Sequence, residues 1–405
     1  MPAVSPTTLA FVRQHKDDDP LQLLLQQQHY PEVDMRMAAQ QIEGRQQARS
    51  KWPTLHACEK VLYPQKLNRE QSSSETSARY KTSLLESIHP HSTIADITGG
   101  MGIDSWLFAQ RSAHVDYIEQ DTTLVDIAIH NFAALGVTNI RCHCDDGIAW
   151  LHGNDSHYDT IYVDPSRRDS NGRRVQAFED CTPNLLEHLD FLLSRCHLLM
   201  VKASPMTDLT AAIAQLRTVR EIHIVAVDGE CKEVLFLVDS ATTPQQMPIH
   251  CVDIHADHTF HNTFTRESED AAAVCYASSV DRYLYEPNAT LMKGGAFHSI
   301  SSWYDAPQLG RATHLYTSSR LITDFPGRIF EVLNPVALNA KDVRRLLPDN
   351  RCHLLCKNYP VSTAVLRKQL RLEEGGDCHL IATRIGQVPI GLLCKRVSPA
   401  APILP

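Results

Sequence analysis

The 405-residue sequence lacks the features that would assign it to a membrane or secretory class. No apolar run approaches the roughly 18 residues that a membrane-spanning helix needs, so no membrane partner is expected. The N-terminus has no basic start followed by an apolar stretch, which argues against a secretory signal and predicts a cytoplasmic protein. With 43% hydrophobic and 21% charged residues, the chain can bury apolar cores without a disulfide or metal staple.

The chain also lacks the residue spacings of common metal sites. Its twelve cysteines are scattered, and neither Cys142-x-Cys144 nor Cys352-x3-Cys356 has a second pair at zinc-finger spacing. No HExxH occurs among the 21 histidines. We therefore expect reduced thiols and no metal ion.

The net charge of −8 is spread unevenly along the sequence. Residues 280–397 contain five lysines and eleven arginines against six aspartates and four glutamates, a net charge of +6, so the rest carries −14. A basic C-terminal part on an acidic body favours a polyanionic partner. The alternative is a basic face that is merely solvated.

The first 80 residues are expected to form a helical N-terminal region. Residues 35–47 place Met37, Ala38 and Ile42 at helical spacing. A serine within Glu70-Gln71-Ser72-Ser73-Ser74-Glu75 can cap a helix predicted over 76–87.

From Ile94 onwards the pattern changes to alternating strands and helices, which is typical of a parallel sheet with helical crossovers. The predicted strands are 93–97, 114–119, 139–144, 159–163 and 197–202. The predicted helices are 104–111, 123–135, 147–152 and 183–195. Further strands are expected at 221–227, 233–238 and 249–254. The fold class is therefore α/β and Rossmann-like over residues 81–274.

A glycine-rich turn, Thr98-Gly99-Gly100-Met101-Gly102, follows the first predicted strand, which ends in Asp96. Glycines permit positive φ and a close approach of backbone to ligand, and ligands bind at the carboxyl ends of such strands. The third glycine of the dinucleotide fingerprint G-x-G-x-x-G is missing. An acidic strand end suits a cationic ligand that bears an amino acid better than a pyrophosphate.

This turn resembles motif I of class I S-adenosylmethionine-dependent methyltransferases, commonly D-x-G-x-G-x-G. Asp96, Gly100 and Gly102 match the motif, while Thr98 replaces its first glycine. The resemblance implies S-adenosyl-L-methionine as the cofactor, bound by Asp96, Thr98, Gly99, Gly100 and Gly102. Five strands closed by a hairpin also match the methyltransferase sheet, whose last strand is antiparallel.

Carboxylates end the next two predicted strands. Glu119 can accept both ribose hydroxyl protons, and Asp145 resembles the acid that bonds the adenine amino group. Asp146 is an alternative to Asp145 in that role. Each acid could instead be a helix N-cap, because helices follow both positions.

Asp164-Pro165-Ser166-Arg167 follows the fourth strand and resembles motif IV of nucleic-acid methyltransferases, D-P-P-(aromatic or Arg). Ser166 departs from the second proline, and no aromatic residue follows. The resemblance implies that these four residues are catalytic, with Asp164 orienting or deprotonating an attacking nitrogen. The alternative is an Asp-Pro turn with solvated arginines.

Four arginines occur within the eight residues 167–174 beside this elbow: Arg167, Arg168, Arg173 and Arg174. Such a group predicts a phosphate clamp, in which Arg168, Arg173 and Arg174 bind substrate. Lys202, which ends the fifth strand, is predicted to bind phosphate or substrate, with a salt bridge to Asp164 as the alternative.

The whole chain resembles bacterial methyltransferases that carry a THUMP-like C-terminal domain. Tyr285-Glu286-Pro287-Asn288-Ala289 and Met292-Lys293 carry this resemblance. It implies a ferredoxin-like domain over 275–325 and a THUMP-like domain over 326–397, both α+β modules. True THUMP domains bind RNA. Basic residues at helical spacings that could contact phosphates are Lys341, Arg344, Arg345, Arg367, Lys368 and Arg371. Two solvated helix faces are the alternative.

The segment 72–75 also resembles the stretch that folds over the cofactor in cap-guanosine methyltransferases. Together these features predict a methyltransferase of a base in tRNA or rRNA. The alternatives are a methyltransferase of a protein or small molecule, against which the basic tail argues, and a non-catalytic RNA-binding protein with a methyltransferase fold. The joint presence of Asp164, Asp96, Glu119 and Asp145 favours an active enzyme over this non-catalytic alternative. No pattern specifies an oligomeric state.

Overall fold

The computed structural model describes residues 4–166, 178–240 and 247–397. The chain divides into two compact units, which are described separately. The first unit comprises residues 1–222 and 232–244, and the second comprises 223–231 and 245–405. Among the described residues, no helix has the length and apolar character needed to cross a membrane.

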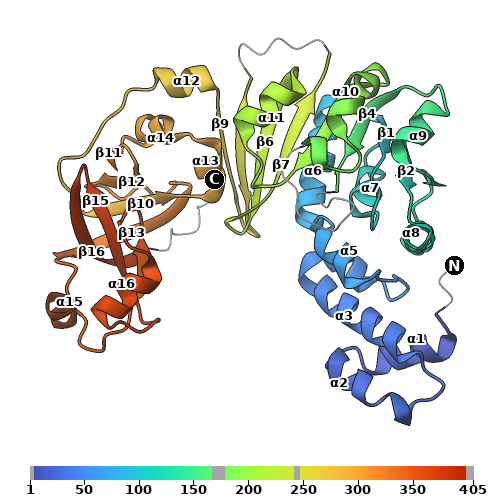
Figure 1. The fold of residues 1–405 in the computed structure, drawn as a ribbon, viewed down its shortest axis with the longest axis horizontal. Coiled ribbons are helices and arrows are strands. Elements are labelled where there is room, and N and C mark those ends of the chain that lie inside the picture. Colours follow the sequence, from blue (N-terminus) through green and yellow to red (C-terminus); the bar gives the residue numbers. More distant parts are fainter. Residues whose placement is uncertain (1–3, 167–177, 241–246, 398–405) are drawn as a thin grey trace. The chain divides into compact units, whose positions relative to one another are not determined.

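The N-terminal region is helical, as predicted, and α1, α2, α3 and α5 gather at one end of the first unit, whereas α6 lies beside α7 at the sheet (Figure 1). The helices are α1 (Pro6–Gln14), α2 (Pro20–Leu25), η1 (Gln27–His29), α3 (Met35–Lys51), α4 (Pro53–Ala57), α5 (Lys66–Gln71) and α6 (Glu75–Ile88). Side-chain caps begin several of them, and the predicted serine cap of α6 is Ser74, whose hydroxyl accepts the Ser77 amide at 3.1 Å. Phe11, Leu23 and Ile42 are buried in the core of this region.

A twisted sheet with the strand order β3-β2-β1-β4-β5-β7-β6-β8-β9 follows. Its strands are β1 (Thr93–Asp96), β2 (His114–Glu119), β3 (Ile140–Cys144), β4 (Tyr158–Val163), β5 (Cys196–Ala203), β6 (Val219–Val227), β7 (Glu230–Val238), β8 (Ile249–Ile254) and β9 (Thr259–Phe264). The neighbours from β3 to β5 are parallel, and β7 pairs antiparallel with β5, as the methyltransferase sheet requires. Strands buried on both faces explain continuous apolar runs such as residues 198–201.

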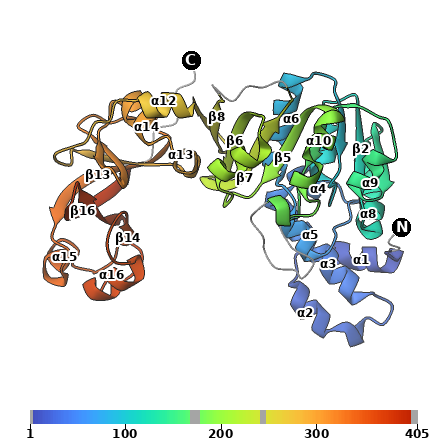
Figure 2. The same cartoon turned by 45° about the horizontal axis from the view of Figure 1, so that its top comes forward.

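Helices cover the parallel strands of this sheet. They are α7 (Ile103–Phe108), α8 (Thr122–Ala134), α9 (Gly147–His152), η2 (Phe178–Asp180), α10 (Leu185–Ser194) and α11 (Leu209–Leu216). The helix α8 packs against β2 and β3, and α9 packs against β2 (Figure 2). The predicted start of the fourth helix at Pro183 is wrong by two residues, because the Asn184 side chain caps Leu186 and the helix begins at Leu185. The strand order reverses at β1, between β2 and β4, where an open α/β sheet forms a ligand crevice.

The second unit contains a seven-stranded sheet of order β11-β12-β10-β13-β16-β15-β14. Its strands are β10 (Tyr283–Pro287), β11 (Gln308–Gly310), β12 (Thr313–Ser318), β13 (Gly327–Val336), β14 (His353–Cys356), β15 (Cys378–Ile385) and β16 (Val388–Val397). The helices are α12 (Arg266–Ala271), α13 (Ala289–Gly294), α14 (Phe297–Tyr304), α15 (Ala340–Leu346) and α16 (Thr363–Leu370). The apolar faces of α15 and α16 share one core, through Val343 and Leu366.

Candidate functional site

A cleft of about 360 Å³ lies at the carboxyl ends of the parallel strands in the first unit. A volume of this size falls within the range of small-ligand sites, roughly 300–1,000 Å³. The predicted site residues that line it are Asp96, Thr98, Gly99, Gly100, Gly102, Glu119, Asp145, Asp164, Pro165 and Ser166. The structure thus brings together residues from four strand ends that are far apart in the sequence.

The shape of the glycine turn depends on close packing and on positive φ. A Cβ atom on Gly99 would lie 2.3 Å from the Tyr117 ring, and Gly102, directly before the first residue of α7, has φ of +79°. Asp96 is buried and organises the same turn. Its carboxylate accepts the Ser105 hydroxyl at 2.5 Å and the Thr98 amide at 3.2 Å. Larger residues at Gly99 or Gly102 would therefore distort the turn.

Burial raises the pKa of Asp96 to about 7, and the neighbouring carboxylates of Asp104 and Asp164 add to this rise. The hydrogen bonds from Ser105 and Thr98 favour the ionised form of Asp96 and so limit the rise in its pKa. The carboxyl group at the centre of the turn therefore changes its charge near neutral pH.

The acids at the ends of β2 and β3 are separate from the helix caps. The cap of α8 is Asp121 and the cap of α9 is Asp146. Glu119 instead accepts the Gly100 amide at 2.9 Å, which ties the end of β2 to the glycine turn. Asp145 accepts the Asp146 amide at 2.8 Å and is exposed in the cleft. The helix-cap interpretation of Glu119 and Asp145 is therefore wrong.

The elbow after β4 is joined to the glycine turn. The Asp164 amide donates to the Thr98 hydroxyl oxygen at 2.7 Å. The Asp164 carboxylate accepts the Lys202 ammonium at 2.5 Å. Of the two alternatives for Lys202, the structure shows the salt bridge, and this side chain is not among the described residues that line the cleft.

Lys202 is almost fully buried, with 8% of its surface exposed. Burial lowers its pKa, but the carboxylates of Asp164, Glu233 and Asp104 outweigh burial and raise the pKa above its ordinary value. The lysine beside the elbow therefore stays charged.

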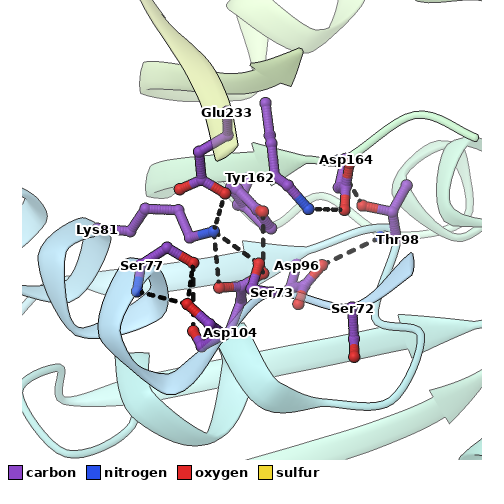
Figure 3. Close-up of polar contacts among 12 residues, drawn as sticks. Ser72, Ser73, Ser77, Lys81, Asp96, Thr98, Asp104, Tyr162, Asp164 and Glu233 are labelled. Atoms are coloured by element: carbon purple, nitrogen blue, oxygen red, sulfur yellow. Dashed lines mark hydrogen bonds and ion pairs between the residues drawn. The ribbon is translucent and has the colours of Figure 1, made fainter. Parts of the chain in front are cut away.

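A buried group of charges, which no sequence pattern indicates, lies behind the turn (Figure 3). Lys81 of α6 is fully buried and pairs with Asp104 at 2.9 Å and with Glu233 of β7 at 3.0 Å. Asp104 also accepts the hydroxyls of Ser73 at 2.8 Å and Tyr162 at 3.0 Å. Burial raises the pKa of Asp104, but the ammonium groups of Lys81 and Lys202 outweigh it and hold the pKa below its ordinary value.

The N-terminal region contributes one wall of the cleft through Asn68, Gln71, Ser72 and Ser73. The Trp52 indole donates to the Ser73 carbonyl at 2.7 Å, and Lys81 donates to the Ser73 hydroxyl at 2.8 Å. These contacts fix Ser73 at the wall of the cleft, within the stretch that resembles the cofactor-covering segment of cap-guanosine methyltransferases.

Arg167, Arg168, Arg173 and Arg174 lie outside the described residues, so their predicted roles stay predictions. In the second unit, basic side chains lie exposed along α15 and α16: Lys341, Arg344, Arg345, Lys368 and, directly after α16, Arg371. The sixth predicted residue, Arg367, is half-buried and pairs with Glu374.

Two family models match the C-terminal part of the chain. Residues 283–326 match the family model of a ferredoxin-like domain, and residues 327–396 match that of a THUMP-like domain. No curated protein matches the chain.

A crystal structure described as a "putative methyltransferase" from Porphyromonas gingivalis W83 matches over 96% of this chain and 98% of its own, with 28% identity and a TM-score of 0.84. A "putative RNA methyltransferase" from Pyrococcus horikoshii matches 47% of this chain and 98% of its own, with 15% identity and a TM-score of 0.35. An rRNA methylase from Streptococcus thermophilus matches 40% and 94%, with 14% identity and a TM-score of 0.31.

The chain therefore combines a class I methyltransferase fold with C-terminal ferredoxin-like and THUMP-like domains. The resemblance and the fold class predicted from the sequence are confirmed.

Proposed function

We propose that this chain transfers a methyl group from S-adenosylmethionine to a base in RNA. The assignment of S-adenosylmethionine as the cofactor rests on the charge of the cleft. Seven carboxylates line it: Asp96, Asp104, Glu119, Asp121, Asp145, Asp146 and Asp164. Among the described lining residues there is no lysine, arginine or histidine. Lys81 and Lys202 pair with two of these carboxylates, Asp104 and Asp164, from the buried side. The carboxylates that remain repel a pyrophosphate and attract a cation, and S-adenosylmethionine carries a sulfonium and an ammonium group.

The donor set also fits the neutral part of this cofactor. An ionised carboxylate has about four acceptor positions, and the Glu119 carboxylate spends two of them on the amides of Gly100 and Asp121. The rest remain for ribose hydroxyls. Asp145 has one described bond, to the adjacent amide, so it can accept the adenine amino group. We assign the amino-acid end of the cofactor to the glycine turn beside Asp96.

When bound, the cofactor would supply a methyl group attached to a sulfonium sulfur. That sulfur is an excellent leaving group, because it departs as a neutral thioether. The chain then has to align the acceptor more than to activate it. Asp164 is the group that holds the acceptor, because its carboxylate lies in the cleft and can accept an N–H from an attacking amine. Lys202 fixes that carboxylate from the buried side.

An RNA acceptor is supported by the THUMP-like domain and by the exposed basic side chains along α15 and α16. Phosphate contacts of this kind give sequence-independent, salt-dependent affinity. An RNA acceptor also fits the cytoplasmic location expected from the sequence.

The cofactor assignment is tested by titration calorimetry with S-adenosylmethionine. Asp145→Ala removes one hydrogen bond to a charged acceptor, typically about 1.5–3 kcal/mol, so the Kd should rise roughly 10- to 100-fold. Asp155→Ala, which changes an exposed carboxylate that is not among the described lining residues, should bind like the wild type. Equal affinities for both variants would count against the assignment.

The acceptor is tested with total RNA from a strain that lacks this gene. Incubation with tritiated S-adenosylmethionine and the full chain should label the RNA, and mass spectrometry of its nucleosides should identify one base that is methylated only in the wild-type strain. If label appears instead in protein or in small molecules, the acceptor assignment is wrong.

A further inference from the structure

Two hydrogen bonds close the chain on itself beside the elbow. The Ser166 amide donates to the Thr182 carbonyl at 2.8 Å, and the Thr182 amide donates to the Ser166 carbonyl at 3.1 Å. Thr182 and Pro183 are thereby brought to the cleft, which both of them line together with Pro165 and Ser166. From the sequence alone, Pro183 was expected only at the start of a helix.

This bridge gives a physical reason for the departure from the D-P-P pattern at position 166. A proline has no amide proton and cannot donate to a carbonyl. The Ser166 amide makes such a bond to Thr182. A second proline at this position would therefore remove one of the two bonds that hold Thr182 and Pro183 at the cleft.

The pattern at the elbow also lacks the aromatic residue that stacks on a base. None of the described residues that line the cleft is Phe, Tyr or Trp. Residues 167–177 contain no aromatic residue in their sequence either. Unstacked bases are usually held by planar contacts, either on aromatic rings or on arginine guanidinium groups. Arg167 stands at the aromatic-or-arginine position of the pattern but lies outside the described residues, so among the described residues a flat acceptor needs another surface to pack against.

Pro183 offers that surface. Its ring is half-buried and lines the cleft, whereas Pro165 on the elbow is buried. A rigid saturated ring can pack flat on a heterocycle through dispersion. The Thr182 side chain is exposed beside it and can donate to or accept from the edge of a base.

We propose that Thr182 and Pro183 form the acceptor wall of the cleft, beside an elbow that carries no aromatic residue, and that the Ser166–Thr182 bridge positions this wall. The ligand class is a planar nitrogen heterocycle, that is, a nucleobase. The inference rests on the proposed function, because it concerns the acceptor of that methyl transfer.

The first test compares Ser166→Pro with Ser166→Ala, since only the former loses the amide proton. For both variants we measure the Kd of S-adenosylmethionine by calorimetry and the initial rate of methylation of total RNA from a strain lacking the gene. We expect Ser166→Pro to keep its cofactor Kd within threefold of wild type, and to methylate limiting RNA at least tenfold more slowly than Ser166→Ala.

Pro183→Ala tests the wall separately from the bridge, because it changes the Pro183 ring and not the backbone groups of Ser166 and Thr182. It should raise the KM for RNA at least fivefold while the cofactor Kd stays within threefold of the wild-type value. Where the wild type methylates RNA, the wall is refuted if Ser166→Pro and Ser166→Ala behave alike, or if both Ser166→Pro and Pro183→Ala weaken cofactor binding as much as RNA binding.

The second test does not need the natural RNA. The full chain is labelled with ¹³C-proline and saturated with S-adenosylhomocysteine, and Pro183 signals are assigned by their loss in Pro183→Ala. Adenosine, guanosine, cytidine and uridine are then added at millimolar concentration. Stacking of a base should shift the Pro183 signals upfield through its ring current, and no shift with any nucleoside contradicts the wall.

The two proposals fail in different ways. If RNA is not methylated but a nucleoside shifts Pro183, the RNA acceptor is wrong and the wall stands. If RNA is methylated while Pro183 is unaffected and Pro183→Ala is as active as the wild type, the wall is wrong and the proposed function stands.

Discussion

The Thr98 hydroxyl oxygen accepts a hydrogen bond from the Asp164 backbone amide at 2.7 Å. Thr98 occupies the position of the first glycine of motif I, and Asp164 begins the elbow at the end of the neighbouring strand β4. A glycine at position 98 could not make this contact. The departure from the motif therefore joins the glycine turn to the residue that we propose holds the acceptor.

Thr98→Val tests this connection, because valine keeps the shape and removes the hydroxyl. It leaves the Asp164 amide without its acceptor, which typically costs about 1–3 kcal/mol. We expect kcat/KM for RNA methylation to fall roughly tenfold or more, since this energy is spent at the elbow. Thr98→Ser should retain clearly more activity, and equal losses in the two variants would argue against a role for the hydroxyl.

The pKa of Asp96 predicts how stability depends on pH. Because the folded state raises this pKa from 3.8 to about 7, it binds the proton more tightly than the unfolded state does. The stabilising contribution is complete below pH 4 and is lost as pH rises to about 7, a loss of about 4 kcal/mol at about 1.36 kcal/mol per pKa unit. Asp96→Asn should therefore flatten the dependence of the unfolding free energy on pH between 5 and 8 in urea titrations. A wild-type profile that is equally flat would contradict this.

Cofactor affinity should follow the same titration. A cationic ligand favours the ionised form of Asp96, so binding should release a proton when the pH is below about 7. We expect the Kd for S-adenosylmethionine to fall as the pH rises from 6 to 8. Calorimetry in buffers of different ionisation enthalpy would measure the proton release, and its absence at pH 6 would count against the prediction.

Lys81 is predicted to be the most sensitive position of the buried network. Lys81→Met leaves Asp104 and Glu233 buried without their shared counter-ion, and breaking a buried pair in this way costs roughly 3–5 kcal/mol. Lys66→Met, which affects an exposed pair with Glu43, should change stability by less than about 1 kcal/mol. Thermal unfolding compares the two variants, and Lys81→Met/Glu233→Met should recover part of the loss if the charge imbalance is its cause.

The basic side chains along α15 and α16 predict a salt-dependent affinity for RNA. Replacing Arg344 and Arg371 by Gln should weaken RNA binding and reduce the slope of log K against log salt by about 0.7–0.9 for every phosphate that the variant no longer neutralises. The Kd of S-adenosylmethionine should not change, because these residues lie in the second unit. Arg282→Gln, which changes an arginine already paired with Glu331, is the control. An unchanged salt slope in the double variant would show that this surface is only solvated.

Much of the fold could be predicted because its information is local. The alternation of strands and helices, the acids at the strand ends and the glycine turn are patterns that span only a few residues each. Glu119 and Asp145 could be picked out in this way, since the carboxyl ends of neighbouring parallel strands meet at one edge of the sheet. The separation of these acids from the caps Asp121 and Asp146 needed the structure, because all four lie next to a helix start.

What the sequence by itself determined was the class of the fold and the edge of the sheet at which the cleft lies. Only the tertiary structure decided which side chains complete that site. Lys81 and Glu233 are 152 positions apart, and Pro183 follows Thr182, which is bridged to Ser166 at the elbow. Neither contact leaves a periodic or spaced pattern, because it depends on how distant elements pack and on which buried charges and amides must then find partners.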